Sequence, residues 1–189
     1  MGLGVQSGWS DPTNPTYVPS GSDFLKIYND IKRIAVRPSG RWVRFDTSLV
    51  SDNNWYNCRV QSEQYDVDAE SGQMLGTISG AADTFTIQTT GLYDLAVRER
   101  FSGSVNGDHG LRIIVVGNPI TLAESDVVIV PLHVQTNYCR TIYYLTAGQQ
   151  VQFQHKYNGF GDPAPLTLYT TVPYPEVTIH MLAEHDLHA

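Results

Sequence analysis

The residues of this 189-residue chain that could do acid–base chemistry begin with Asp108 and His109, an adjacent carboxylate and imidazole. They lie in the stretch SGSVNGDHG over residues 102–110, whose glycines and serines favour a loop. A hydrolase also needs a nucleophile within hydrogen-bond reach of the imidazole. The sequence has neither a nucleophile-elbow motif nor a phosphate-binding glycine loop. We therefore predict that the chain is not an enzyme and that His109 has no catalytic role.

Two groups of side chains have the chemistry of metal ligands. Three histidines cluster near the end of the chain, namely His180, His185 and His188. Imidazoles suit zinc or nickel, but this loose spacing is more typical of a polar tail after a last strand. Three carboxylates are closely spaced, namely Asp66, Asp68 and Glu70. They lack the glycine bend and the closing bidentate glutamate of a calcium loop, so we predict no metal site and no cofactor.

The two cysteines, Cys58 and Cys139, match no metal-binding or redox spacing. Free cysteines are among the most buried residue types and behave as small hydrophobic side chains. We predict two buried free thiols, and a disulfide bond between them stays open as the alternative.

Composition and charge exclude some classes of protein. Hydrophobic residues make up 41% of the chain, which suffices for a sizeable core, and charged residues make up 16%. The formal net charge of -7 argues against a nucleic-acid-binding protein. There is no apolar run of transmembrane length and no secretory signal pattern at the start. We predict no membrane insertion, and a protein that stays in a cytosol or leaves it inside an assembled particle.

Residues 1–39 are predicted to form an extended arm followed by one short amphipathic helix. Residues 1–22 are rich in Gly, Pro and Ser, yet they carry Trp9 and Tyr17, which need a surface to bury them. Residues 23–36 place apolar side chains at helical spacing, and Pro38 prevents the helix from continuing. A helix this short is marginal alone, so its apolar face must pack against something.

The same region carries a concentration of positive charge. Between Lys26 and Arg44 there are six basic residues and one acidic residue, Asp30, in an otherwise acidic chain. One interpretation is an anchor that docks on an acidic neighbour, and the other is a solvated helix face or an arm lying across its own assembly. The predicted anchor residues are Trp9, Tyr17, Phe24, Ile27, Tyr28, Ile31, Lys32 and Arg33.

From Gly40 onward the hydrophobic period changes to two, which predicts strands. We expect strands at residues 41–49, 55–60, 84–88, 92–101, 111–117, 127–135, 139–145, 150–156 and 177–183. Short strands with no helix between them predict an antiparallel sandwich or barrel. We therefore expect residues 40–189 to form a single all-β head.

Two of these segments carry a more specific expectation. In 92–101 the apolar side chains alternate, but Glu99 interrupts the apolar face, which predicts a β-bulge or a sheet edge there. Residues 127–135 (VVIVPLHVQ) are apolar on both faces, which predicts a strand buried on both sides.

Aromatic and apolar residues provide two sets of binding candidates. Tyrosines are favoured where a surface is half buried, as at protein interfaces and sugar-contacting faces. The predicted surface-binding residues are Tyr157, Phe160, Tyr169 and Tyr174. The predicted trimer-contact or core residues are Tyr93, Leu95, Val97, Tyr143, Val151 and Phe153.

Three local patterns appear in a fixed order: Phe85-Thr-Ile followed by Gly91-Leu92-Tyr93, then LRIIV over 111–115 leading to Gly117-Asn118, then LTAGQQVQF over 145–153. Across residues 83–183 the chain resembles the complement-component-1q/tumour-necrosis-factor-type family. Gln149 departs from the aspartate usual in that family after the turn glycine. The resemblance implies an antiparallel two-sheet jelly-roll sandwich and a homotrimer.

With its short arm and single head, the chain looks most similar to the small trimeric proteins of tailed bacteriophage virions. We expect a minor tail or fibre-tip protein, assembled in the host cytoplasm and located in the virion. Its arm would bind other virion structural proteins, and its head would contact a glycan or protein of the host surface. The alternative is a capsid decoration protein that stabilises the particle without recognising a host.

Overall fold

A computed structural model describes residues 21–22, 24–27, 38–44, 48–49, 51–67, 83–104, 106–117, 120–160, 164–169 and 175–184. Residues 21–22 and 24–27 are helical; 24–27 lie within the helix predicted over 23–36, and 21–22 precede it. No described helix is long and apolar enough to cross a membrane. The division into an arm over 1–39 and a head over 40–189 stays a prediction.

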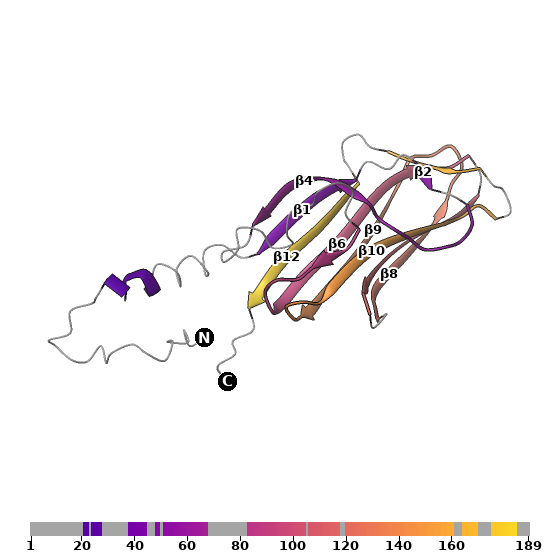
Figure 1. Cartoon of the computed structure of the whole chain (residues 1–189). Coiled ribbons are helices and arrows are strands. Elements are labelled where there is room, and N and C mark those ends of the chain that lie inside the picture. Colours follow the sequence, from indigo (N-terminus) through magenta and orange to yellow (C-terminus); the bar gives the residue numbers. More distant parts are fainter. Residues whose placement is uncertain are drawn as a thin grey trace.

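The rest of the described chain is built from strands, whose long members run side by side along a common direction (Figure 1). The strands are β1 (Ser39–Arg44), β2 (Ser48–Leu49), β3 (Tyr56–Asn57), β4 (Val60–Val67), β5 (Phe85–Thr86), β6 (Gly91–Ser102), β7 (Gly107–Val115), β8 (Ile120–Ile129), β9 (Gln135–Leu145), β10 (Gln150–Asn158), β11 (Leu166–Leu168) and β12 (Glu176–Glu184). The all-β antiparallel architecture predicted from the sequence is confirmed.

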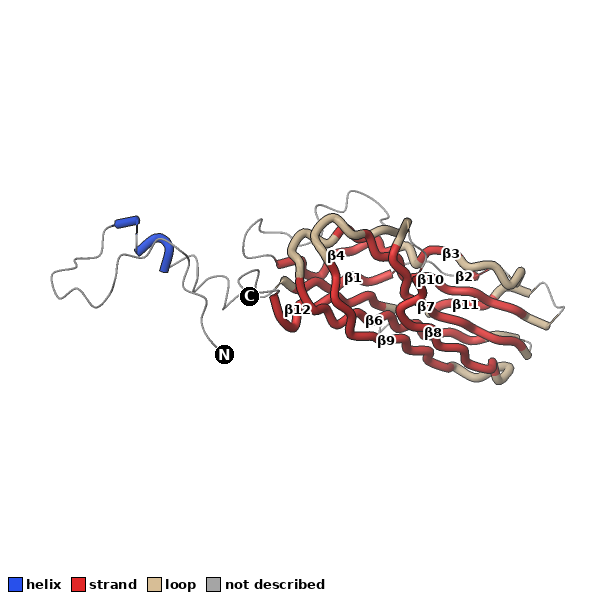
Figure 2. Tube along the Cα trace, turned by 90° about the horizontal axis from the view of Figure 1, so that it is seen from below, coloured by secondary structure: helices blue, strands red, loops and turns tan. Residues whose placement is uncertain are grey.

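Within the described residues the strands form two antiparallel sheets. The larger sheet has the order β2-β11-β6-β12-β1-β4, and β9 pairs with the other side of β6. The smaller sheet has the order β3-β10-β7-β8, and β5 also pairs with β10. Strands β9 and β8 are thus the last described strands of their sheets, and they lie on the same side of the sandwich (Figure 2).

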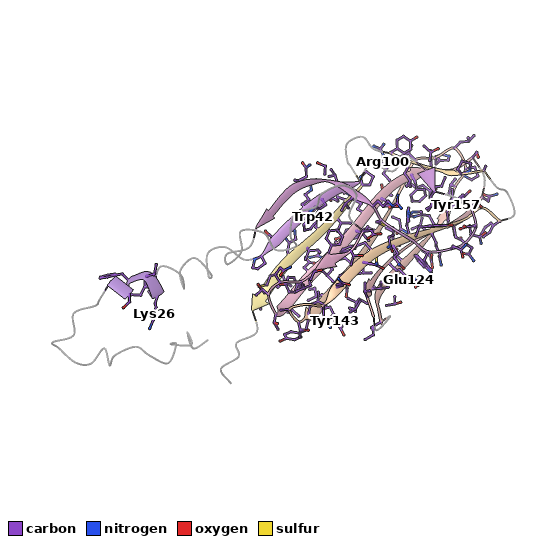
Figure 3. All side chains as sticks on the ribbon, viewed as in Figure 1. Lys26, Trp42, Arg100, Glu124, Tyr143 and Tyr157 are labelled. Carbon is purple, nitrogen blue, oxygen red and sulfur yellow. The ribbon has the colours of Figure 1, made fainter. Side chains whose placement is uncertain are left out.

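Inward-facing side chains of the two sheets form two apolar clusters. In the larger cluster the Trp42 and Phe85 rings lie 5.0 Å apart, and Phe153 meets Phe85 edge-on at 5.5 Å. The smaller cluster contains Phe101 and Tyr157. Trp42 and Tyr157 lie toward different ends of the sandwich (Figure 3). Aromatic side chains of this size contribute much of the apolar area that a small domain buries.

Strand β1 buries Trp42. The sequence places Trp42 and Val43 on opposite faces, yet both are buried. Pairing with β4 shifts register on either side of these two residues, with the extra residue in β4 each time, and Trp42 joins the larger apolar cluster. The indole also lies over Gly40, where an added Cβ would come within 1.9 Å of the ring. Only glycine leaves room for the indole there.

Three expectations about individual segments are wrong. Glu99 lies neither at a bulge nor at an edge, because β6 is a central strand whose register with β9 is continuous through Glu99. His109 lies in β7 rather than in a loop. The segment 127–135 is not one buried strand: β8 ends at Ile129, a turn follows, and Val128 is 65% exposed.

Candidate functional site

Apolar side chains are exposed along β8, β9 and the turn that joins them. Among the described residues, eight of the twelve exposed large hydrophobic residues lie in this region: Ile120, Val128, Val130, Leu132, Val134, Tyr138, Ile142 and Tyr144. We call this set the β8–β9 edge. Such a concentration on one edge of a small protein is typical of an interaction surface.

Leu132 is the most exposed of these side chains, at 86%, and its backbone is strained. The turn begins at Val130, whose carbonyl accepts a hydrogen bond from His133 N at 3.2 Å. Pro131 occupies the second position, and Leu132 has a φ of 64° at the third. This is the pattern of a type II turn, in which the third position favours glycine. A leucine there costs about 1 kcal/mol of backbone strain without being buried in its own chain.

Side chains join β8 to β9 near this turn. The Gln135 amide accepts a hydrogen bond from Val130 N at 2.7 Å and donates one to the Val128 carbonyl at 3.0 Å. The Asn137 amide accepts from Ser125 Oγ at 2.7 Å and donates to the Ser125 carbonyl at 3.1 Å. These contacts hold the β8–β9 edge in place across the gap between the two sheets.

Charged groups flank the β8–β9 edge on both sheets. On β9, Arg140 makes a two-point contact with Asp94, at 2.7 and 2.6 Å, and this hydrogen-bonded ion pair raises the pKa of Arg140. On β8, Asp126 lies 3.2 Å from Lys156 Nζ. The same ammonium lies 4.7 Å from the centre of the Trp55 ring. The charges beside the edge are thus paired within the chain.

A second feature, in the interior, is a group of polar side chains around Glu99. The Glu99 carboxylate lies 2.9 Å from His109 Nε2, 3.2 Å from His155 Nδ1 and 3.6 Å from Cys58 Sγ. All four side chains are at most 2% exposed. Glu99 belongs to the larger sheet and both histidines to the smaller one. We call these four residues the Glu99 cluster, which links the two layers through polar contacts.

Asn137 determines which nitrogen of His109 carries the proton. Its side-chain oxygen accepts from Tyr138 N at 2.8 Å, so its nitrogen must be the atom that faces His109. That nitrogen donates to the His109 carbonyl at 3.0 Å and lies 3.3 Å from His109 Nδ1. The amide nitrogen cannot accept a proton from Nδ1, whereas the Glu99 carboxylate beside Nε2 can, so the geometry favours the Nε2–H tautomer, which donates to Glu99.

The predicted surface-binding residues do not form one surface. Tyr157 is fully buried, because odd-numbered residues of β10 face inward, so its assignment to a surface is corrected. Phe160 is 59% exposed. Tyr169 is half-buried and contacts Arg100, whose guanidinium lies 5.3 Å from the ring centre. Tyr174 lies outside the described residues.

The predicted trimer-contact or core residues all lie in or against the core of the single chain. Tyr143 is half-buried and packs against the larger apolar cluster. The fully buried members are Tyr93, Leu95, Val97, Val151 and Phe153. These side chains are therefore not exposed for contact with another chain.

Only two of the predicted anchor residues are described. Phe24 is 61% exposed, and Ile27 is half-buried. The other anchor candidates lie outside the described residues: Trp9, Tyr17, Tyr28, Ile31, Lys32 and Arg33. The same holds for four of the possible metal ligands, namely Asp68, Glu70, His185 and His188.

The cysteines are both buried and neither is in a disulfide bond, as predicted. Burial raises the pKa of the Cys139 thiol to about 11, and the negative charge of Glu124 adds to this shift. Cys139 therefore stays protonated at neutral pH. Cys58, in contrast, belongs to the Glu99 cluster.

The sequence patterns do not predict that the four residues of the Glu99 cluster come together. The available signal was that Glu99 and His155 each occupy an inward-facing position in the alternating pattern of a predicted strand, whereas His109 falls in the stretch expected to be a loop. An ionisable side chain at such a position needs polar partners, because an unpaired buried charge is costly. The sequence alone does not identify these partners, because they come from different strands.

Comparison with known proteins identifies the fold. No family model matches the chain, and no curated protein matches it in sequence. The crystal structure of murine APRIL at pH 5.0 has a TM-score of 0.58 and 15% identity, covering 77% of this chain and 99% of that one. The globular domain of zebrafish complement 1qA has a TM-score of 0.56 and 14% identity, covering 79% and 100%. The chain thus has the predicted jelly-roll sandwich fold of the complement-q/tumour-necrosis-factor type.

Proposed function

We propose that the chain is a non-enzymatic assembly module that forms a homotrimer through its β8–β9 edge. The observation that carries this proposal is Leu132, a strained leucine that is 86% exposed. Burying a leucine side chain contributes about 1.5 to 3 kcal/mol, which exceeds the strain. The occupant of the edge is another copy of the chain, in keeping with the trimer that the family resemblance implies.

The neighbouring side chains favour such a contact. Ile142 and Tyr144 extend the apolar surface along β9, and Tyr138 adds a ring with a polar tip. Interfaces between subunits are enriched in aromatic residues at a partly apolar centre and have charges at the rim. Arg140 lies on the same outer face between Tyr138 and Ile142 and is already paired with Asp94, so its charge has a partner within its own chain.

We further propose that the trimer is a structural and binding component of a bacteriophage virion, as a minor tail or fibre-tip protein. The arm and the basic helix would attach it to other virion structural proteins. The support is the positive surplus between Lys26 and Arg44 and the exposed Phe24. The head would then point outward, where Phe160 is available to a host-surface glycan or protein.

Light scattering on the purified full chain tests the trimer. We expect the mass of three copies at micromolar concentration, and a shift to monomer when Ile142→Arg places a charge in the β8–β9 edge. Gln64→Arg is the matched control, because Gln64 is exposed on β4 at the opposite end of the larger sheet. A wild-type monomer, or equal loss of trimer in both variants, contradicts the proposal.

Labelling of intact particles tests the virion role. Antibody against the head, viewed by electron microscopy, is expected to bind at the tail tip. Labelling spread over the capsid would instead identify a decoration protein. Purified particles that lack the chain would overturn the virion role while leaving the trimer in place.

A further inference from the structure

We propose that the Glu99 cluster is a binding site for one zinc ion, which links the two sheets from inside the sandwich. Cys58 Sγ, His155 Nδ1 and the carboxylate of Glu99 are the ligands. His109 is a positioning residue that orients the carboxylate. This site lies in the core, apart from the β8–β9 edge, and does not depend on the proposed assembly.

The first argument is the set of donor atoms. A thiolate, an imidazole and a carboxylate together are the ligands that zinc uses in proteins. Glu99 directs Oε1 toward Cys58 and Oε2 toward His155, at 3.6 and 3.2 Å. One carboxylate oxygen together with Sγ and Nδ1 therefore supplies three protein ligands, and a water molecule would complete a four-coordinate zinc site.

The second argument is spacing. Ligand atoms bound to zinc in a tetrahedron lie roughly 3.3 to 3.6 Å from each other, given bonds of about 2.0 to 2.3 Å. The donor atoms of Cys58, Glu99 and His155 all lie within 4.8 Å of one another. Side-chain adjustments on the order of 1 Å would bring them to zinc-bonding distance.

The third argument is charge. Glu99 is 1% exposed, and Cys58 is 1% exposed. A buried carboxylate is stable only when paired or coordinated. With zinc bound, one thiolate and one carboxylate balance the two positive charges, and His155 stays neutral. The thiol releases its proton to solvent, and the Nδ1 proton of His155 moves to Nε2, so the imidazole stays neutral.

His109 is not a ligand because its Nε2 keeps its proton. The amide nitrogen of Asn137 lies 3.3 Å from Nδ1 and cannot accept a hydrogen bond, so a proton on Nδ1 would have no acceptor there. The Nε2–H group donates to Glu99 Oε2 at 2.9 Å, and the ring stacks on Phe101 with centres 4.3 Å apart. Hydrogen bonds of this kind orient metal-binding carboxylates.

Cobalt(II), which replaces zinc in such sites, provides the first test. The full chain is unfolded under reducing conditions and refolded with cobalt, because a site in the core is filled as the chain folds. We expect a single cobalt ion per chain, a thiolate-to-cobalt charge-transfer band, and loss of that band when zinc is added. A refolded wild-type chain without the band overturns the proposal.

Variants assign the ligands. Cys58→Ser is expected to abolish the band and to lower cobalt affinity by more than roughly 100-fold, beyond the effect of an outer-shell partner. Cys139→Ser is the matched control, since Cys139 is equally buried but lies outside the cluster, and it should keep the band. His109→Gln should retain the band and weaken cobalt binding by roughly 10- to 100-fold. A band that survives Cys58→Ser overturns the proposal.

If Cys58→Ser does not fold, X-ray absorption on the zinc-loaded wild-type chain shows whether a cysteine sulfur binds the zinc ion. We expect one sulfur at about 2.3 Å and nitrogen or oxygen neighbours at about 2.0 to 2.2 Å. A zinc coordination shell without sulfur would mean that zinc binds elsewhere. The Glu99 cluster would then be a hydrogen-bonded network and the proposal would be wrong.

Discussion

The Nε2 atom of His109 lies 2.9 Å from a carboxylate oxygen of Glu99, and both side chains are buried between the two sheets. This contact crosses the layer that apolar side chains fill elsewhere in the sandwich. Because both side chains are buried, they satisfy their hydrogen bonds within the protein, and Glu99 also contacts His155 and Cys58. The interior is therefore sensitive to single polar substitutions at this point.

We expect Glu99→Gln to lower the free energy of unfolding by about 1 to 3 kcal/mol. The amide has one acceptor oxygen in place of two, and its NH2 group would face a histidine N–H. Urea unfolding in the presence of a chelator measures the change without any contribution from metal. Glu124→Gln is the control, because Glu124 is partly exposed and lies 3.6 Å from Lys156. This substitution should lower the free energy of unfolding by less than about 1 kcal/mol. Equal losses in both variants would contradict the role of Glu99.

We expect Cys139 to react slowly with iodoacetamide in the folded chain. We also expect the folded chain to lose stability at alkaline pH because of this thiol. Its folded pKa of about 11 lies above the ordinary value of 9.0. Between these values the unfolded chain loses the thiol proton before the folded chain does, so stability falls as pH rises. Urea unfolding at pH 8 and pH 10 checks this, and Cys139→Ser should show a smaller loss. If Cys139→Ser loses as much unfolding free energy between pH 8 and pH 10 as the wild-type chain does, ionisation of Cys139 is not the cause.

The alternating strands and the fold were predictable from local pattern. Tyr93 and Leu95 on β6, and Val151 and Phe153 on β10, all face inward. A period of two determines which side chains share a face, and in each of these strands the odd-numbered face is the more buried one. The pattern therefore predicts the inward face without knowledge of the partner strands.

The Glu99 cluster and the β8–β9 edge were not predictable in the same way. Cys58, Glu99 and His155 are far apart in the sequence and meet only because one sheet packs on the other. The apolar run that includes Val128 and Leu132 predicts burial, but it does not tell burial in the same chain from burial against another. In the single chain both residues are exposed.

We expect Leu132→Gly to weaken the trimer while leaving the monomer at least as stable. Glycine removes the strain of a positive φ and also removes the exposed apolar side chain. Phe160→Gly is the matched control, because Phe160 also has a positive φ, of 47°, and is 59% exposed outside the β8–β9 edge. Sedimentation of both variants over a range of concentrations measures assembly. A trimer weakened equally by both changes would argue against the edge as the interface.

The last prediction concerns the arm and the head. The carbonyl of Pro38 accepts a hydrogen bond from Met181 N at 2.8 Å, and β1 begins at Ser39. The contact ties Pro38 to β12 just before β1 begins. We expect deletion of residues 1–37 to leave a trimeric head with a nearly unchanged Tm that no longer joins the particle.

A longer deletion, of residues 1–44, is the control for this experiment. It removes β1 together with Trp42, which is fully buried against Phe85. Loss of a buried tryptophan costs about 3 to 5 kcal/mol, so this head should unfold or aggregate. Calorimetry and light scattering on the two truncated chains measure the difference. If the chain without residues 1–37 also unfolds or falls to monomers, the arm is part of the folded head, and its role as a separate anchor is wrong.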